Sequence, residues 1–145
     1  MFTIDDLNYD YVPVNPDDLY FFYDWRFKIT IGNRQSQIIE GCFSTFYADG
    51  IFLEAIVNVL LKYEEAGVEG CWWYYPDLES AYPEDVFEGV CFELGFDDPA
   101  NRIYVTEQEN FQYTKLACQR FVEIHPEHKR LITIILDNWM PLNSI

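Results

Sequence analysis

The segment from Cys71 to Asp85 carries four carboxylates among five aromatic rings. Carboxylates bind Arg and Lys through charge-assisted hydrogen bonds, and aromatic faces attract the same cations. The chemistry that this pattern favours is therefore the capture of basic side chains from a protein partner. The residues that we expect to make these contacts are Asp77, Glu79, Glu84, Asp85, Glu88, Trp73, Tyr75 and Tyr82.

The aromatic rings at residues 71–75 also fit a purely structural role. In a strand, Trp72 and Tyr74 face one side while Trp73 and Tyr75 face the other, and only a sheet covered on both faces buries both pairs. Aromatic stripes serve core packing more often than ligand contact. An ordinary central strand in an aromatic core therefore stays open as the alternative.

Other groups that could do chemistry form weaker patterns. His125 and His128 flank Pro126, which interrupts the helix that a two-histidine metal site would use, so we expect an exposed helix terminus instead. Carboxylate pairs within residues 77–88 could serve acid–base catalysis, but in a chain with 25 acids such pairs arise by chance. The sequence has no serine–histidine–aspartate pattern, phosphate-binding glycine loop or nucleotide fingerprint. We therefore predict no enzyme activity, no cofactor and no metal.

The elements before this segment are predicted from composition and turn residues. Residues 1–18, with two prolines and two aspartate pairs, predict an extended acidic lead-in. Aromatic and β-branched residues dominate residues 19–31 and 37–47, with a turn at Gly32-Asn33-Arg34 between them, so we expect a β-hairpin.

A buried helix should follow the hairpin. Asp49 can cap a helix that begins at Gly50 and ends at Gly67, and its side chains are apolar nearly all round. Such a helix would form the buried centre of the fold.

The second half of the chain alternates strand and helix signals. Residues 108–124 have helical spacing up to Pro126, and residues 127–139 combine a helix start with β-branched residues, for which we favour a helix. Short strands are expected at 71–75, 86–94 and 102–106. The fold class is therefore α+β: a single domain over residues 1–145, with a mixed or antiparallel sheet of about five strands and two or three helices on one face.

The negative charge is concentrated in two segments. Of a formal net charge of -16, residues 1–24 carry six acids and no base, and residues 64–109 carry thirteen acids and one base. Concentrated charge of one sign attracts a partner of the opposite sign. Binding to nucleic acid is strongly disfavoured, because neutralising phosphates requires a patch of Lys and Arg and the nine bases are scattered along the chain.

Length and composition indicate one soluble domain with its own core. The chain has 145 residues, of which 50% are hydrophobic and 19% aromatic, which is too apolar for a disordered acidic tail. Neither a membrane-spanning run nor a signal peptide is visible, so a cytoplasmic location without membrane contact is expected. The four cysteines are far apart, without a C-x-x-C pair, and are expected to be buried free thiols.

The stretch Trp72-Trp73-Tyr74-Tyr75-Pro76-Asp77, in a small acidic chain rich in Tyr and Trp, resembles the CdiI immunity proteins of bacterial contact-dependent growth inhibition (CDI) systems. The resemblance in size, charge and α+β layout extends over the full chain. It implies an antitoxin that binds one basic toxin, often a nuclease such as an RNase or DNase, in a 1:1 complex with a monomer. The toxin's active site or substrate surface would be covered, without catalysis.

Two other functions remain open at this point. An acidic nucleic-acid mimic that inhibits a restriction or CRISPR enzyme would use the same charge, spread over much of its surface. A carbohydrate-active domain would use Trp72, Trp73 and a carboxylate pair, but the expected cytoplasmic location and the lack of a visible signal peptide count against it. The two charged segments and the aromatic content favour a compact surface for protein recognition.

Overall fold

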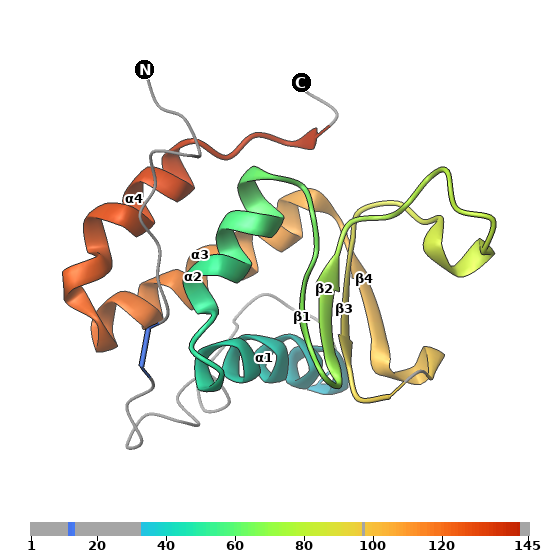
Figure 1. The fold of residues 1–145 in the computed structure, drawn as a ribbon, viewed down its shortest axis with the longest axis horizontal. Coiled ribbons are helices and arrows are strands. Elements are labelled where there is room, and N and C mark those ends of the chain that lie inside the picture. Colours follow the sequence, from blue (N-terminus) through green and yellow to red (C-terminus); the bar gives the residue numbers. More distant parts are fainter. Residues whose placement is uncertain (1–11, 14–32, 97, 143–145) are drawn as a thin grey trace.

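A four-stranded antiparallel sheet with helices packed on one face forms the centre of the fold (Figure 1). The computed structural model describes residues 12–13, 33–96 and 98–142. The predicted acidic lead-in, apart from Val12 and Pro13, and the first strand of the predicted hairpin lie outside these residues. The predicted α+β class is confirmed, and the sheet is antiparallel rather than mixed.

The sheet is a meander in which each strand pairs with the next along the chain. The strands are β1 (Ala66–Val68), β2 (Cys71–Tyr74), β3 (Val90–Leu94) and β4 (Arg102–Val105). In this register Trp72 lies opposite Glu93, and Glu93 lies opposite Arg102. All three expected strands after residue 70 are present, although β3 begins at Val90 rather than Val86.

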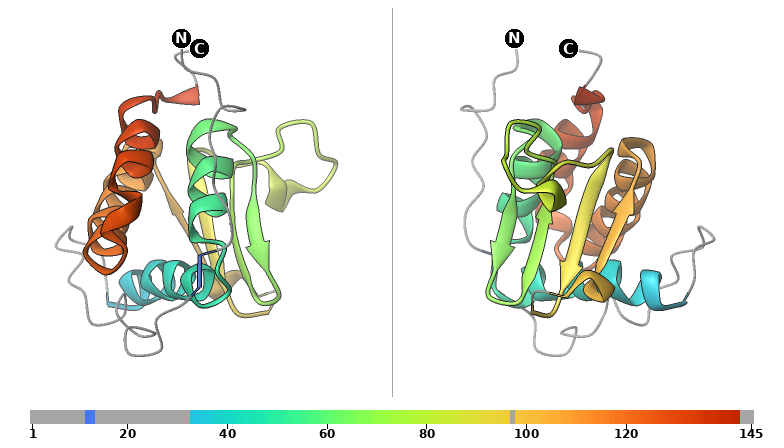
Figure 2. Two further views of the ribbon diagram at one scale, coloured as in Figure 1. Left: turned by 60° about the vertical axis from the view of Figure 1, so that its left-hand side comes forward. Right: turned by 90° about the vertical axis from the view of Figure 1, so that its right-hand side faces the viewer.

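The two faces of the sheet differ in chemistry because side chains alternate along each strand. The inner face packs against the helices and carries the buried residues Trp73, Phe92, Ile103 and Val105. The opposite face, here called the outer face, carries Trp72, Tyr74, Glu93, Arg102 and Tyr104. The right-hand view of Figure 2 looks onto this outer face, with the connection between β2 and β3 in front of it.

The prediction of a strand at residues 37–47 is wrong. This segment belongs to helix α1 (Asn33–Ala48), which crosses the inner face of the sheet. Its buried side chains include Ile39, Phe43 and Tyr47, which are spaced four residues apart and therefore lie on one side of a helix. The aromatic and β-branched composition that suggested a strand serves this helix–sheet packing instead.

The buried central helix is present but shorter than predicted. It consists of α2 (Phe52–Ile56) and a π-helical turn, η3 (Val57–Leu61). Its N-cap is Ile51 without a side-chain cap, so Asp49 does not have the expected role. The helix ends before Lys62 rather than at Gly67, which lies in β1. As predicted, it is apolar nearly all round, with buried Phe52, Leu53, Ala55, Ile56, Val57, Val59, Leu60 and Leu61.

Two further helices complete the layer. Helix α3 (Glu107–Ile124) begins with a capping box in which Thr106 and Glu109 each bind the other's backbone N–H, and it confirms the helix expected at 108–124. After a short 3₁₀ turn, η6 (Pro126–His128), helix α4 (Lys129–Asp137) confirms the favoured assignment for residues 127–139.

The cysteines agree with the expected free, buried thiols. Cys42, Cys71, Cys91 and Cys118 are all free and buried. Burial raises the pKa of the Cys118 thiol far above its ordinary value and that of Cys91 to about 11. Among the described residues, no helix is long and apolar enough to cross a membrane.

Candidate partner-binding site

A groove of about 680 Å³ opens on the outer face of the sheet. It is lined by Tyr63, Glu64, Glu65, Trp72, Tyr74, Tyr75, Pro76, Asp77, Glu84, Asp85, Glu93 and Arg102. Six of these residues are acids, four are aromatic, and the single base is Arg102. We call this hollow the acidic groove. Its lining can provide carboxylates for cations and ring faces for stacking.

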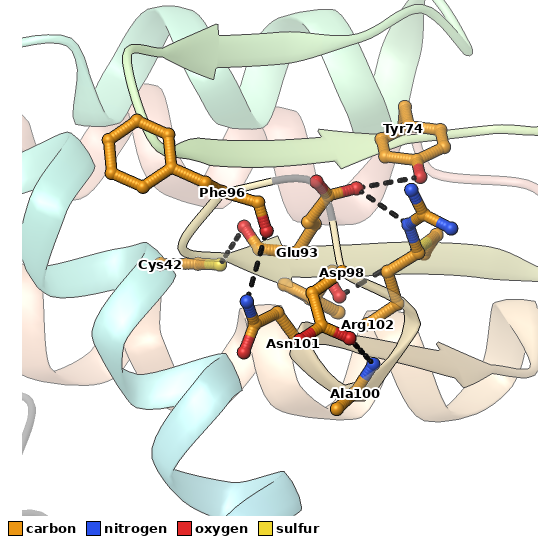
Figure 3. Close-up of polar contacts among 10 residues, drawn as sticks. Cys42, Tyr74, Glu93, Phe96, Asp98, Ala100, Asn101 and Arg102 are labelled. Carbon is orange, nitrogen blue, oxygen red and sulfur yellow. Dashed lines mark hydrogen bonds and ion pairs between the residues drawn. The ribbon is translucent and has the colours of Figure 1, made fainter.

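Arg102 and Glu93 form an ion pair within this lining (Figure 3). Arg102 Nε lies 3.0 Å from Glu93 Oε1, and the two side chains are only 13% and 11% exposed. The Tyr74 hydroxyl donates to the same carboxylate oxygen at 3.3 Å. Strand pairing places these groups side by side, because Glu93 lies opposite both Trp72 and Arg102. The one base of the groove is thus paired with a carboxylate of the same lining.

Trp72 forms a wall of the groove because its neighbour across the strand pair is a glycine. Its ring lies directly over Gly67, where an added Cβ would be 1.9 Å from Cε3 of the indole. The side chain is 39% exposed. Trp72 and Glu65 also line a smaller hollow of about 230 Å³. The indole and this carboxylate therefore border two openings.

Tyrosines at one end of the groove are tied to the C-terminal segment. The Tyr63 hydroxyl donates to the Met140 carbonyl at 2.7 Å, and the Tyr75 hydroxyl donates to Glu107 Oε2 at 3.1 Å. The same carboxylate oxygen accepts the Leu142 backbone N–H at 2.6 Å. Burial raises the pKa of Tyr63, and burial followed by the nearby Glu107 charge raises that of Tyr75. Both phenols therefore stay neutral at physiological pH and add no charge.

The connection between β2 and β3 forms a loop with its own hydrogen bonds, here called the 77–85 loop. The backbone N–H of Asp77 donates to the Asp85 carbonyl at 2.8 Å and closes the loop at its base. The Ser80 hydroxyl donates to Asp85 Oδ2 at 2.6 Å, and the Glu79 backbone N–H donates to Asp77 Oδ1 at 3.1 Å. Beyond the loop, Phe87 packs against Tyr74 and Tyr104 of the outer face.

The eight predicted contact residues occupy different environments. Trp73 is fully buried and donates through Nε1 to Asn110, so the prediction that it contacts a partner is corrected: it belongs to the core. Glu88 lines a separate hollow of about 640 Å³ beside β4 and the start of α3. Glu79 and Tyr82 are exposed on the 77–85 loop. The structure brings together four of them in the acidic groove: Tyr75, Asp77, Glu84 and Asp85.

Sequence reasoning missed several lining residues. Tyr63, Glu64 and Glu65 lie between the central helix and β1, where a longer helix was predicted. Glu93 and Arg102 come from strands that were predicted correctly. Their pairing requires the register between β3 and β4, which composition does not reveal.

A helix terminus lies at the two histidines as predicted, but His125 and His128 are half-buried rather than exposed. His125 Nε2 lies 2.8 Å from the Tyr47 hydroxyl, and its Nδ1 lies 3.2 Å from Glu127 Oε1. Hydrogen bonding to its own backbone, with a smaller contribution from His125, lowers the pKa of Glu127. Within residues 12–13, 33–96 and 98–142, no group of three or more His, Cys, Asp or Glu side chains could hold a metal ion.

Gly67→Ala should displace the Trp72 indole, because the new methyl group would overlap the ring. Gly67 does not adopt a left-handed conformation, so the ring alone has to move. We expect the free energy of unfolding in urea to fall by about 1–2 kcal/mol. In a Trp72→Ala background the same change should cost almost nothing, which a double-mutant cycle measures. An equal cost in both backgrounds would contradict the stacking of Trp72 over Gly67.

The comparison with known proteins agrees with the resemblance noted in the sequence. Residues 35–136 match the family described as CDI immunity protein. Comparison with individual curated proteins gives no significant match. The matched range includes the whole sheet and nearly all of the helical layer. Such a family implies an antitoxin with a cognate toxin as its partner, and immunity proteins are generally not enzymes. The chain belongs to the CDI immunity protein family.

Proposed function

We propose that this immunity protein neutralises a basic nuclease toxin by binding it through the acidic groove and the adjoining 77–85 loop. The observation that carries the proposal is the lining of the groove, which has six carboxylates and four aromatic rings around one base that is already paired. Such a surface fits Arg and Lys side chains of a partner. It does not fit a phosphate backbone.

The proposal that the toxin is a nuclease rests on the positive charge expected of the partner. A nuclease must bind phosphates, so its substrate surface is rich in Lys and Arg. An inhibitor with carboxylates on the matching surface gains steering during approach as well as pairing after contact. We therefore infer that the toxin is an RNase or DNase domain. We also propose that one monomer of the immunity protein binds one toxin molecule and that binding takes place in the cytoplasm.

The sharpest test uses variants that remove one negative charge without changing side-chain volume. Glu65 and Glu84 are exposed lining residues of the groove, so Glu65→Gln and Glu84→Gln should leave stability nearly unchanged. Each should weaken binding to the cognate toxin domain by about 2 kcal/mol or more, because a toxin cation would stay buried without its carboxylate. Titration calorimetry measures this loss.

The matched control is Asp137→Asn, an exposed residue at the end of α4 and outside the groove. It changes the net charge by the same amount, so it corrects for the long-range field. Stopped-flow mixing should also show that association slows as salt rises, since exposed charges are screened beyond about 8 Å at physiological ionic strength. If Asp137→Asn weakened binding as much as the groove variants, the groove would not be the contact surface.

A further inference from the structure

The 77–85 loop stands out from the outer face of the sheet, on the side away from the helices (Figures 1 and 2). We propose that this loop inserts into the nucleic-acid-binding cleft of the toxin while one lip of that cleft lies in the acidic groove. The proposal rests on the proposed function and adds which toxin surface is covered. Inhibition is then competitive with nucleic acid.

The first support is apolar surface that the fold leaves uncovered. Leu78 is 71% exposed and Tyr82 is 65% exposed, and Val86, just beyond the loop, is also exposed. Large apolar side chains grouped on one protrusion are a feature of interaction surfaces. This observation is independent of the carboxylates, and it indicates a partner that covers the loop from more than one side.

The second support is the order of the loop. The hydrogen bond between Asp77 and Asp85 closes its base, and Ser80 is held by both of these aspartates. A 3₁₀ turn, η4 (Pro83–Asp85), fixes its second half. Because binding a preformed loop loses little conformational entropy, more of the contact energy appears as affinity. Asp77 and Asp85 thus shape the loop, and Glu79 and Glu84 are exposed for contact.

The third support is shape. The acidic groove begins at the base of the loop, since Asp77, Glu84 and Asp85 line it. On the immunity protein, a protruding loop lies beside a groove. The complementary toxin surface has a cleft that receives the loop and a raised edge that enters the groove. The flat or convex back of a nuclease would leave either the loop or the groove without contact, whereas the edge of its cleft can fill both.

The fourth support is the match between the loop and nucleic acid. A nuclease cleft has cations for phosphates and often aromatic side chains on which bases stack. The exposed carboxylates of Glu79 and Glu84 can take the places of phosphates, and the exposed ring of Tyr82 can take the place of a base. Leu78 adds apolar contact at the same protrusion.

A competition assay with nucleic acid tests the insertion. The toxin domain is bound to a short fluorescein-labelled oligonucleotide that it cannot cleave, either 2′-O-methyl RNA or phosphorothioate DNA, and anisotropy is followed as immunity protein is added. The wild-type protein should displace the oligonucleotide. A Leu78→Ser/Tyr82→Ser variant, with unchanged charge, should require about a 100-fold higher concentration, as expected for central anchors of an interface.

The matched control is Phe96→Ser. Phe96 is 78% exposed but lies in the connection between β3 and β4, which joins the opposite ends of the strands from the 77–85 loop. This variant should compete like the wild type. Circular dichroism and thermal melting of both variants establish that they are folded.

Several results would overturn the insertion. Toxin bound by wild-type protein with the oligonucleotide still in place would do so and would leave the antitoxin function intact. Competition by the loop variant as strong as that of the wild type would likewise overturn the insertion and leave the antitoxin function intact.

If the free protein formed a dimer that the loop variant abolished, a second copy of this chain, rather than the toxin cleft, would be the partner of the loop. A toxin that bound the immunity protein but neither oligonucleotide would overturn the insertion and the nuclease assignment together. Absence of any toxin binding would overturn the proposed function as well.

Discussion

Trp73→Ala should lower the free energy of unfolding by about 3–5 kcal/mol, the range for removing a large aromatic side chain from a core. The indole is fully buried and packs against Phe43, Phe46 and Phe92, with ring centroids 5.3–6.1 Å away. Its Nε1 donates to Asn110 Oδ1 at 2.8 Å. The substitution therefore creates a cavity and also leaves a buried acceptor without its donor.

Urea denaturation of three variants separates these contributions. Trp73→Phe keeps much of the ring volume and loses the hydrogen bond, so it should cost roughly 1–3 kcal/mol. Trp72→Ala changes the neighbouring indole on the outer face and should cost less than Trp73→Ala. Similar losses for Trp72→Ala and Trp73→Ala would contradict the assignment of the two tryptophans to opposite faces.

Glu93→Ala should also be strongly destabilising, by about 3–5 kcal/mol, because it removes one partner of a largely buried ion pair. The Arg102 guanidinium would lose the carboxylate at 3.0 Å, and the Tyr74 hydroxyl would lose its acceptor. Replacing both charges by apolar groups of similar length, Glu93→Leu with Arg102→Met, should recover most of the loss.

The unfolding free energies of Glu93→Ala, Glu93→Leu, Arg102→Met and the Glu93→Leu/Arg102→Met double variant form the measurement. Glu93→Gln serves as the conservative control, since its amide oxygen can still accept from Arg102 and Tyr74. If Glu93→Leu alone were as stable as the double variant, the cost of Glu93→Ala would come from lost packing at position 93 rather than from the unpaired guanidinium.

The sequence predicted the secondary structure correctly where a segment carried one dominant pattern. Residues 108–124 have helical spacing and a stop at Pro126, and they lie within α3. Residues 71–75 have aromatic strand composition, and β2 covers all but the last of them. In both cases local preference and tertiary packing agree.

Residues 37–47 show why composition alone is insufficient. Ile38, Ile39 and Phe43 belong to types that favour strands, yet the spacing of the buried residues is helical. This segment covers the inner face of the sheet, so packing decides its structure. Counting apolar positions at intervals of three and four residues would have identified the helix.

The candidate site was predicted only in part because its residues meet across the sheet. The 77–85 loop is continuous in sequence, and its carboxylates could be selected directly. Alternation in β2 predicted that Trp72 and Trp73 face opposite sides, but which side the helices cover depends on the whole fold. Trp73 was therefore assigned to the exposed surface although it is buried under the helices, and the pairing of Glu93 with Arg102 required strand register.

The hydrogen bond that closes the 77–85 loop at its base has an evolutionary consequence. Because the backbone of Asp77 meets that of Asp85 directly, the residues between them form an insert whose length and composition can change while β2 and β3 remain paired. Under the proposed function, the part of the toxin-binding surface that this loop supplies is encoded apart from the strands that form the sheet. A lineage whose toxin diverges could then change its specificity by replacing this short segment, while the sheet and helices stay the same.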